Sequence, residues 1–86
     1  MGSYEVRMTH SAEKDLGNLS SSAIAVLWPR MKALAQDPRP RQAKRLKGAE
    51  KAYRLRVRAY RVVYTVDDEQ KMVVVTAVRH RREAYR

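Results

Sequence analysis

The sequence has no cysteine, and only two histidines and three glycines among its 86 residues. Without cysteine, disulfide scaffolds, thiol catalysis and the usual zinc modules are excluded. The histidines, His10 and His80, lie far apart in the sequence and neither has an acidic cluster beside it, so we expect no metal site and no cofactor. The scattered glycines form no phosphate-binding loop, which removes the common nucleotide-binding motifs.

Long apolar runs are also missing. No run approaches the roughly 20 residues that a membrane span needs. Residues 1–10 lack the apolar stretch of a signal peptide. We therefore expect a cytoplasmic protein with no membrane partner. The length suits one domain over residues 1–86, and a hydrophobic content of 44% is enough for a core.

Positive charge is abundant and concentrated. Nineteen Lys and Arg against nine Asp and Glu give a formal charge of +10. Residues 39–61 alone contribute +9, whereas residues 1–38 are neutral and residues 62–86 contribute +1. Such a block attracts polyanions and speeds their association. Nucleic acid is the favoured partner, and a solvated face or an acidic protein partner are the alternatives.

The first half of the chain predicts a strand and two helices. Residues 4–8 alternate apolar and charged side chains, the period of a half-buried strand. Thr9 or Ser11 can cap a helix that ends near Leu19.

Serines 20–22 can cap a second helix, and Pro29 predicts a kink in it or a helix that restarts there. Its apolar residues follow the i, i+3, i+4, i+7 stripe of a core-facing helix. We therefore expect Trp28 to pack in the core rather than to stack on a ligand. The stripe comprises Ile24, Leu27, Trp28, Met31 and Leu34.

After residues 37–40 the apolar period changes to two, which is typical of strands. Residues 72–78 are apolar on both faces, as in a central strand. The fold class is therefore α+β: an N-terminal strand, a two-helix hairpin kinked at Pro29, and three or four antiparallel strands. We expect these strands over residues 43–46, 53–58, 60–66 and 72–78, with turns at residues 48–50, 58–59 and 67–70.

Two helices can cover only one face of this sheet. The alternation then places Arg54, Arg56 and Arg61 on the other face, on neighbouring strands. Guanidinium groups so placed repel one another and gain nothing from packing. Selection for stability alone would not retain them, so we expect something anionic to neutralise them.

One reaction suits arginines without a protein nucleophile: cleavage of RNA by attack of the ribose 2′-hydroxyl on its own phosphate. The protein then has to align the nucleotide and stabilise the charge of the transition state. A histidine or tyrosine near the phosphate could move protons. The basic C-terminal run, residues 79–86, contains both residue types.

Several segments, taken in order and spacing, resemble the RelE toxins of toxin–antitoxin pairs. The resemblance implies a fold similar to microbial ribonucleases. It also implies an mRNA interferase that enters the 30S A site, cuts mRNA to a 2′,3′-cyclic phosphate and a 5′-hydroxyl, and so inhibits translation. The segments are Leu46-Lys47-Gly48, Tyr53-Arg54-Leu55-Arg56-Val57, Tyr60-Arg61-Val62-Val63-Tyr64, Asp67-Asp68, and Val78-Arg79-His80-Arg81-Arg82-Glu83-Ala84-Tyr85.

The resemblance also implies a catalytic site, formed by Arg54, Arg56, Arg61, Arg81 and Tyr85. One departure concerns proton transfer, because RelE toxins tend to have lysines where this chain has Arg54 and Arg56. Arginine stays protonated, so it cannot readily act as the base. His80, the ribosome or solvent remain as proton carriers. The other basic residues assigned to RNA or ribosome binding are Lys44, Arg45, Lys47, Arg58 and Arg82.

The partners implied are the ribosome, mRNA and a cognate RelB-like antitoxin. We expect an acidic or amphipathic antitoxin segment to mask Arg61, Arg81 and Tyr85. Two alternatives remain: a ParE-type toxin, which shares the fold but poisons DNA gyrase, and a non-catalytic RNA-binding module or degenerate toxin. All three readings predict binding to polyanions or acidic peptides, so cleavage is the observation that separates them.

Overall fold

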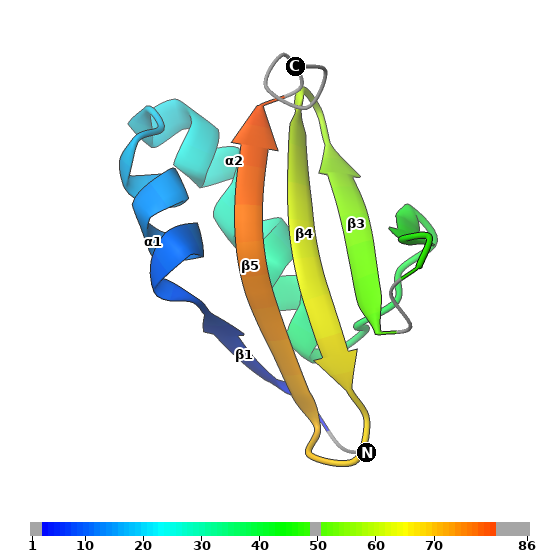
Figure 1. The fold of residues 1–86 in the computed structure, drawn as a ribbon. Coiled ribbons are helices and arrows are strands. Elements are labelled where there is room, and N and C mark those ends of the chain that lie inside the picture. The colour runs from blue at the N-terminus through cyan, green and yellow to red at the C-terminus, as the bar shows by residue number, and fades with distance from the viewer. Residues whose placement is uncertain (1–2, 49–50, 81–86) are drawn as a thin grey trace.

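The computed structural model describes residues 3–48 and 51–80, and within them a five-stranded mixed sheet lies against two helices (Figure 1). This α+β architecture confirms the predicted fold class. The elements in chain order are β1 (Glu5–Met8), α1 (His10–Gly17), α2 (Ser21–Lys32), the short 3-10 helix η1 (Ala33–Ala35), β2 (Ala43–Arg45), β3 (Ala52–Val57), β4 (Tyr60–Asp67) and β5 (Met72–His80).

Both helices begin where the sequence placed a capping residue. The Thr9 side chain accepts a hydrogen bond from the Ala12 N–H, and Ser20 does the same for the Ala23 N–H. Helix α1 ends at Gly17, earlier than the expected Leu19. After proline, glycine is the residue least suited to a helix, which explains the early end.

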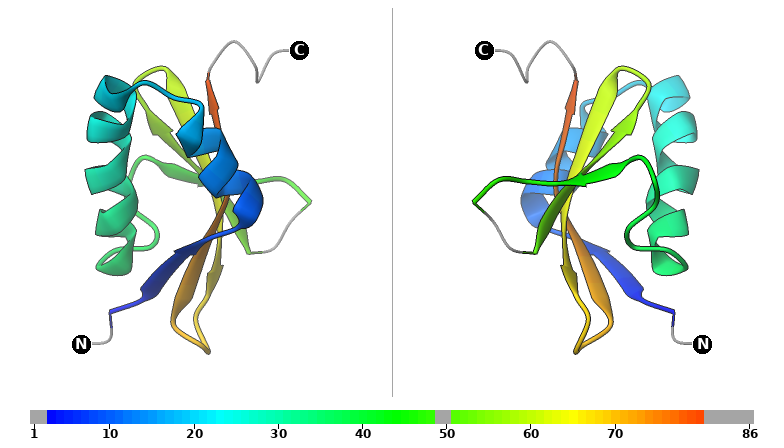
Figure 2. Two further views of the ribbon diagram at one scale, coloured as in Figure 1. Left: turned by 90° about the vertical axis from the view of Figure 1, so that its left-hand side faces the viewer. Right: turned by 90° about the vertical axis from the view of Figure 1, so that its right-hand side faces the viewer.

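Helix α2 runs through Pro29 as one helix, so the predicted alternative of a restart at Pro29 is wrong (Figure 2). Proline removes one amide donor, but Leu27 and Met31 on either side of it are buried and hold the helix against the sheet. The expectation that Trp28 packs in the core is also wrong, because its side chain is 44% exposed. Leu27, Met31 and Leu34 already fill the space above the sheet, so the neighbouring indole lies at its margin.

The strand order is β1-β5-β4-β3-β2. Strands β2 to β5 pair antiparallel with their neighbours, as predicted, whereas β1 pairs parallel to β5. Alternation shows that residues 4–8 form a strand but carries no information on its direction. Strand β5 lies between β1 and β4, which explains its apolar residues on both faces.

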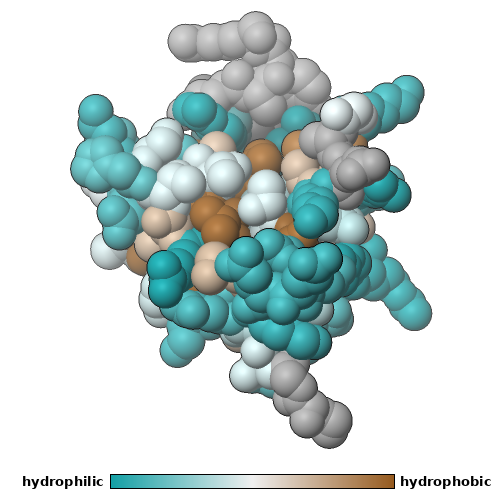
Figure 3. All heavy atoms as spheres, turned by 60° about the horizontal axis from the view of Figure 1, so that its bottom comes forward, coloured by the Kyte–Doolittle hydropathy of each residue, from teal (hydrophilic) through white to brown (hydrophobic). Residues whose placement is uncertain are grey.

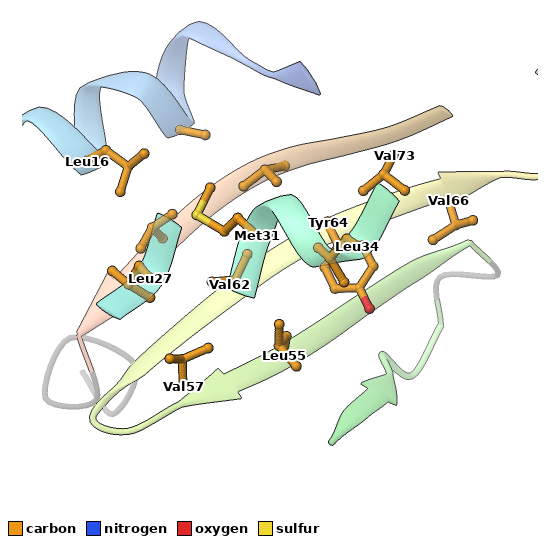
Figure 4. Packing of buried hydrophobic residues seen from close by; sticks show 13 residues of the cluster. Leu16, Leu27, Met31, Leu34, Leu55, Val57, Val62, Tyr64, Val66 and Val73 are labelled. Carbon is orange, nitrogen blue, oxygen red and sulfur yellow. The ribbon is translucent and has the colours of Figure 1, made fainter. Parts of the chain in front are cut away.

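The core lies on one face of the sheet. Figure 4 shows Leu27, Met31 and Leu34 above Val62 and Tyr64 of β4. A β-bulge interrupts the β4–β5 ladder, since Val63 pairs with Ala77 but the next residue, Tyr64, pairs with Val75. The extra residue shifts the alternation of β5, so its buried valines are Val73, Val75 and Val78.

In the part of the chain that the structure describes, none of the helices has the length and apolar character to cross a membrane.

Candidate functional site: a cationic sheet face

Strand pairing gathers basic side chains on the face of the sheet opposite the core. Residues directly opposite each other on paired strands point to the same face. Arg56 of β3 pairs with Arg61 of β4, and Arg61 pairs with Arg79 of β5. We call Arg56, Arg61 and Arg79 the arginine row. Beside it, Lys44 of β2 pairs with Arg54 of β3, which extends the positive charge to the edge of the sheet.

A hollow of about 430 Å³ opens beside this row and is lined almost entirely by cations. Arg58, at the tip of the β3–β4 hairpin, contributes to it although its backbone adopts a left-handed conformation with φ of 55°. A non-glycine residue rarely adopts that conformation without a reason. The lining residues are Gln42, Lys44, Arg54, Arg56 and Arg58.

Within the described residues, none of the ion pairs neutralises the cations of this hollow. Among residues 3–48 and 51–80, the ion pairs join Arg7 to Glu5, Arg39 to Asp68 and Arg79 to Asp15. None of these pairs involves Lys44, Arg54, Arg56 or Arg58. Such an uncompensated group of guanidinium donors can bind and polarise a phosphate.

No group of three or more His, Asp or Glu side chains that could hold a metal ion occurs among the described residues.

The remaining residues assigned from the sequence are distributed differently. Arg45 alternates with Lys44, so it points away from the cationic face and lines another hollow together with Arg39, Tyr53 and Asp68. Lys47 is exposed beyond β2. The predicted positions Arg81, Arg82 and Tyr85 lie outside the described residues.

His80 lies on the core side of the sheet rather than with the arginine row. It pairs with Tyr60, and the two rings contact each other edge to face with centroids 5.1 Å apart. This placement agrees with the alternation of strand β5, by which His80 and Arg79 point to opposite faces.

Gln42 and Arg79 belong to this face but were not predicted as site residues. Gln42 precedes β2 in a segment without periodicity, so no signal marks it. Arg79 belongs to the basic C-terminal run and to a segment that resembles RelE toxins, but it occupies none of the positions matched to their catalytic site. Its place in the row depends on the β-bulge of β5, which the sequence pattern did not predict.

Arg39, counted in the same basic block, has a different environment. Its Nη2 donates to the Asp68 carboxylate at 2.6 Å and its Nε donates to the Tyr53 hydroxyl at 2.9 Å. The Tyr4 hydroxyl donates to the other Asp68 oxygen at 2.6 Å. We call Tyr4, Arg39, Tyr53 and Asp68 the Arg39 network. These hydrogen bonds, from Arg39 first and then from Tyr4, lower the pKa of Asp68 below its ordinary value.

The Arg39 network stands next to the core. Tyr53 stacks on Tyr64 with ring centroids 5.8 Å apart, and the buried Tyr64 hydroxyl donates to the Pro38 carbonyl at 2.7 Å. Burial raises the pKa of Tyr64 to about 12. Figure 3 views the molecule from the end that carries the β4–β5 hairpin and shows a mainly hydrophilic surface with small hydrophobic patches. At this end, therefore, the charge of Arg39 is balanced by Asp68 of the protein itself.

Comparisons with known proteins agree with the fold. Residues 6–85 match the family model described as the ParE toxin of the type II toxin–antitoxin system parDE. A protein named as the toxin RelE1 of Methanocaldococcus jannaschii is 28% identical in an alignment 86 positions long that covers 96% of each chain.

Two solved structures are similar over nearly the whole chain. In the RelBE2 toxin–antitoxin complex of Mycobacterium tuberculosis, the matching chain is 32% identical, with a TM-score of 0.82 over 92% of this chain and 99% of that one. In the intact RelBE complex of E. coli, the matching chain is 28% identical, with a TM-score of 0.77 over 87% of this chain and 93% of that one.

These matches define the class of the protein: it is a toxin of a type II toxin–antitoxin system, and its fold is RelE-like. The chain belongs to the RelE/ParE superfamily. The resemblance to RelE toxins that the sequence motifs indicated is thereby confirmed, and the family model adds that the ParE branch is similar too.

Proposed function

We propose that this toxin is an endoribonuclease that inhibits translation by cleaving mRNA in the 30S A site of the ribosome. The observation that supports this most directly is the cationic face, where Arg54, Arg56 and Arg61 lie together and α1 and α2, the α-helices of the described residues, leave them uncovered (Figure 2). An RNA backbone is an anion that such a face can bind, and an extended single strand can lie along it.

The proposed reaction is attack of a ribose 2′-oxygen on the adjacent phosphorus. The new bond closes a 2′,3′-cyclic phosphate, and the bond to the 5′-oxygen of the next nucleotide breaks. The 2′-hydroxyl gives up one proton and the leaving 5′-oxygen takes one up, so no other reagent is consumed. Guanidinium groups that face the phosphate would stabilise the negative charge that builds on its oxygens.

The proton transfers need groups other than the arginines, which remain protonated. The contact of His80 with Tyr60 holds it on the core side of the sheet, away from the arginine row. We therefore assign the 2′-hydroxyl proton to the ribosome or to solvent. From the resemblance alone, Arg81 is assigned to the transition state and Tyr85 to stacking on the scissile nucleotide.

The test is cleavage of mRNA in a purified translation system, with the cuts mapped by primer extension. Programmed ribosomes are compared with naked RNA, and the wild type with Arg56→Ala and Arg81→Ala. The control is Lys32→Ala, which removes the charge of an exposed side chain on α2. We expect cuts on ribosomes that both site variants lose and the control keeps.

Other results would change the assignment. Cuts on naked RNA would indicate a free-standing ribonuclease and would return His80 to consideration. Folded protein that cuts neither substrate would overturn the proposal.

A second candidate function is poisoning of DNA gyrase, which the match to the ParE family model favours. A supercoiling assay with purified gyrase decides it. Inhibition of gyrase without cleavage of mRNA would place the chain with ParE-type toxins, whereas cleavage without inhibition would exclude that reading.

We also propose a cognate antitoxin as partner. The similar chains from M. tuberculosis and E. coli were solved as RelBE toxin–antitoxin complexes. An acidic segment of the antitoxin would neutralise the cationic face and mask Arg61. Co-purification with the product of the neighbouring gene tests this partner, and expression of the toxin alone without growth inhibition would count against it.

A further inference from the structure

Arg79 occupies a position that the predicted catalytic set leaves out. It lies directly opposite Arg61, which lies directly opposite Arg56, so the three arginines cross three adjacent strands at one level. Without the β-bulge, the buried alternation of Val73 and Val75 would continue through Ala77 to Arg79 and turn this side chain toward the core. With the bulge, Val78 is buried and Arg79 joins the cationic face.

Arg79 has a counter-charge that holds it only loosely. Its Nη1 is 3.9 Å from Asp15 Oδ1, and the Arg79 side chain is 50% exposed. The other oxygen of Asp15 accepts the Val78 N–H at 2.9 Å, on the part of β5 that extends beyond its pairing with β1. Asp15 is therefore anchored to the sheet by its own hydrogen bond. Asp15 is only 18% exposed, but at 3.9 Å from a half-exposed guanidinium the pair contributes little, so Arg79 can exchange Asp15 for another anion.

We propose that Arg79 binds the RNA phosphate adjacent to the scissile one, and that Asp15 tunes this contact. Neighbouring strands are about 4.8 Å apart, so the row from Arg56 to Arg79 extends about 10 Å across the sheet. That length exceeds the width of one phosphate group, so the two ends of the row meet different phosphates. The RNA backbone then crosses the strands from β3 towards β5.

This inference rests on the proposed ribonuclease function and assigns Arg79 to binding and positioning rather than to bond cleavage. A residue that contacts a flanking phosphate equally in the ground state and the transition state changes KM and leaves kcat unchanged. A structural role would instead alter the thermal stability of the protein.

The experiment measures KM and kcat for a short synthetic mRNA on programmed ribosomes. It is repeated with mRNAs in which the phosphate on one or the other side of the scissile phosphate is a neutral methylphosphonate. For Arg79→Gln we expect KM to rise about tenfold on unmodified mRNA with kcat unchanged, as for loss of one charge-assisted contact. One of the two methylphosphonates should raise the wild-type KM similarly and should have no further effect on Arg79→Gln.

Asp15→Asn gives the opposite prediction. The asparagine oxygen can still accept the Val78 N–H, but the charge that competes for Arg79 is gone, so KM should fall about twofold. The double variant with Arg79→Gln should lose this gain. Arg7→Gln is the control, because Arg7 is an exposed arginine of β1 paired with Glu5, outside the row.

Three results would overturn the assignment of Arg79. The first is that Arg79→Gln has the wild-type KM. The second is that each of the two methylphosphonates raises the KM of Arg79→Gln as much as it raises that of the wild type. The third is that Arg7→Gln raises KM as much as Arg79→Gln does. If the wild type cleaves no mRNA, the proposed function fails. If the wild type cleaves mRNA and Arg79→Gln has the wild-type KM, the proposed function stands and only the assignment of Arg79 fails.

Discussion

Arginines occur at two ends of the same sheet in opposite circumstances. At one end Arg39 donates to Asp68 and Tyr53 and lies over the Tyr53 ring at 5.4 Å. At the other end Arg56 is placed directly opposite Arg61 and has no acidic partner among the described residues. The same residue type therefore has its charge balanced within the protein in one region, whereas in the other it has no acidic partner among the described residues.

The difference shows that charge content alone does not locate a binding surface. Arg39 and Arg56 belong to the same basic block of the sequence, residues 39–61. Arg39 links segments that are distant along the chain, which is a structural task. Like charges directly opposite each other on paired strands destabilise a sheet, so the pair of Arg56 and Arg61 is better explained by a ligand than by folding.

The sharpest way to test this comparison is to neutralise one arginine at each end. Arg56→Gln should lower the rate of mRNA cleavage about a hundredfold, because a donor to the transition state is lost. The melting temperature should stay the same or rise, since a repulsion is removed. Cleavage on programmed ribosomes and thermal unfolding are measured on the same preparations.

Arg39→Gln should give the reverse result. We expect a loss of about 1 kcal/mol in the free energy of unfolding, discounted for the partial exposure of Arg39, and thus a few degrees in melting temperature. Cleavage should remain within twofold of the wild type. If Arg39→Gln abolished cleavage while the protein stayed folded, the division between a structural and a functional end would be wrong.

A second comparison concerns the two hairpins, each of which has one non-glycine residue in a left-handed conformation. These residues are Arg58, with φ of 55°, and Lys71, with φ of 54°. Glycine adopts this conformation without steric cost, so Arg58→Gly should stabilise the fold by about 0.5 kcal/mol. The gain for Lys71→Gly should be smaller, because the Lys71 ammonium lies 5.1 Å from the Tyr4 ring centre and that contact is lost.

The two glycine variants should differ in activity. Arg58 lines the cationic hollow, so its replacement should weaken RNA binding about threefold to tenfold, whereas Lys71→Gly should leave cleavage unchanged. Equal cleavage by both variants would mean that the strained Arg58 is not retained for the ligand. Denaturant unfolding and KM on programmed ribosomes are the two measurements.

Alternation alone was sufficient to predict that Arg54, Arg56 and Arg61 share the face opposite the core. The pairing register confirms this. Features that depend on three-dimensional context were not predictable. The bulge that brings Arg79 into the row and the parallel pairing of β1 leave no mark on the local apolar pattern.

Trp28 was misjudged, and the partner of Arg39 was not foreseen, for the related reason that composition cannot show which neighbours fill a space. The helical stripe contained one apolar residue more than the core above the sheet could hold, and Trp28 is 44% exposed as a result. Likewise, the basic block gave no sign that Arg39 has Asp68 as a partner across 29 positions of sequence.

The smallest expected effect concerns the acid side of the Arg39 network. Arg39 and Tyr4 lower the pKa of Asp68 from its ordinary 3.8, so the folded state favours the charged carboxylate. The contribution of the Asp68 carboxylate to the stability of the fold is complete above pH 3.8 and is lost as the pH falls through the lower pKa that Asp68 has in the folded protein. Asp68→Asn lacks it throughout, so its melting temperature should lie below that of the wild type near neutral pH and approach it in acid. Glu69→Gln, which removes the same charge from the same hairpin, should show no such convergence. If Arg56→Gln, and not Asp68→Asn, showed this convergence with the wild type in acid, the conclusion that the charge is balanced at the Arg39 end would be wrong.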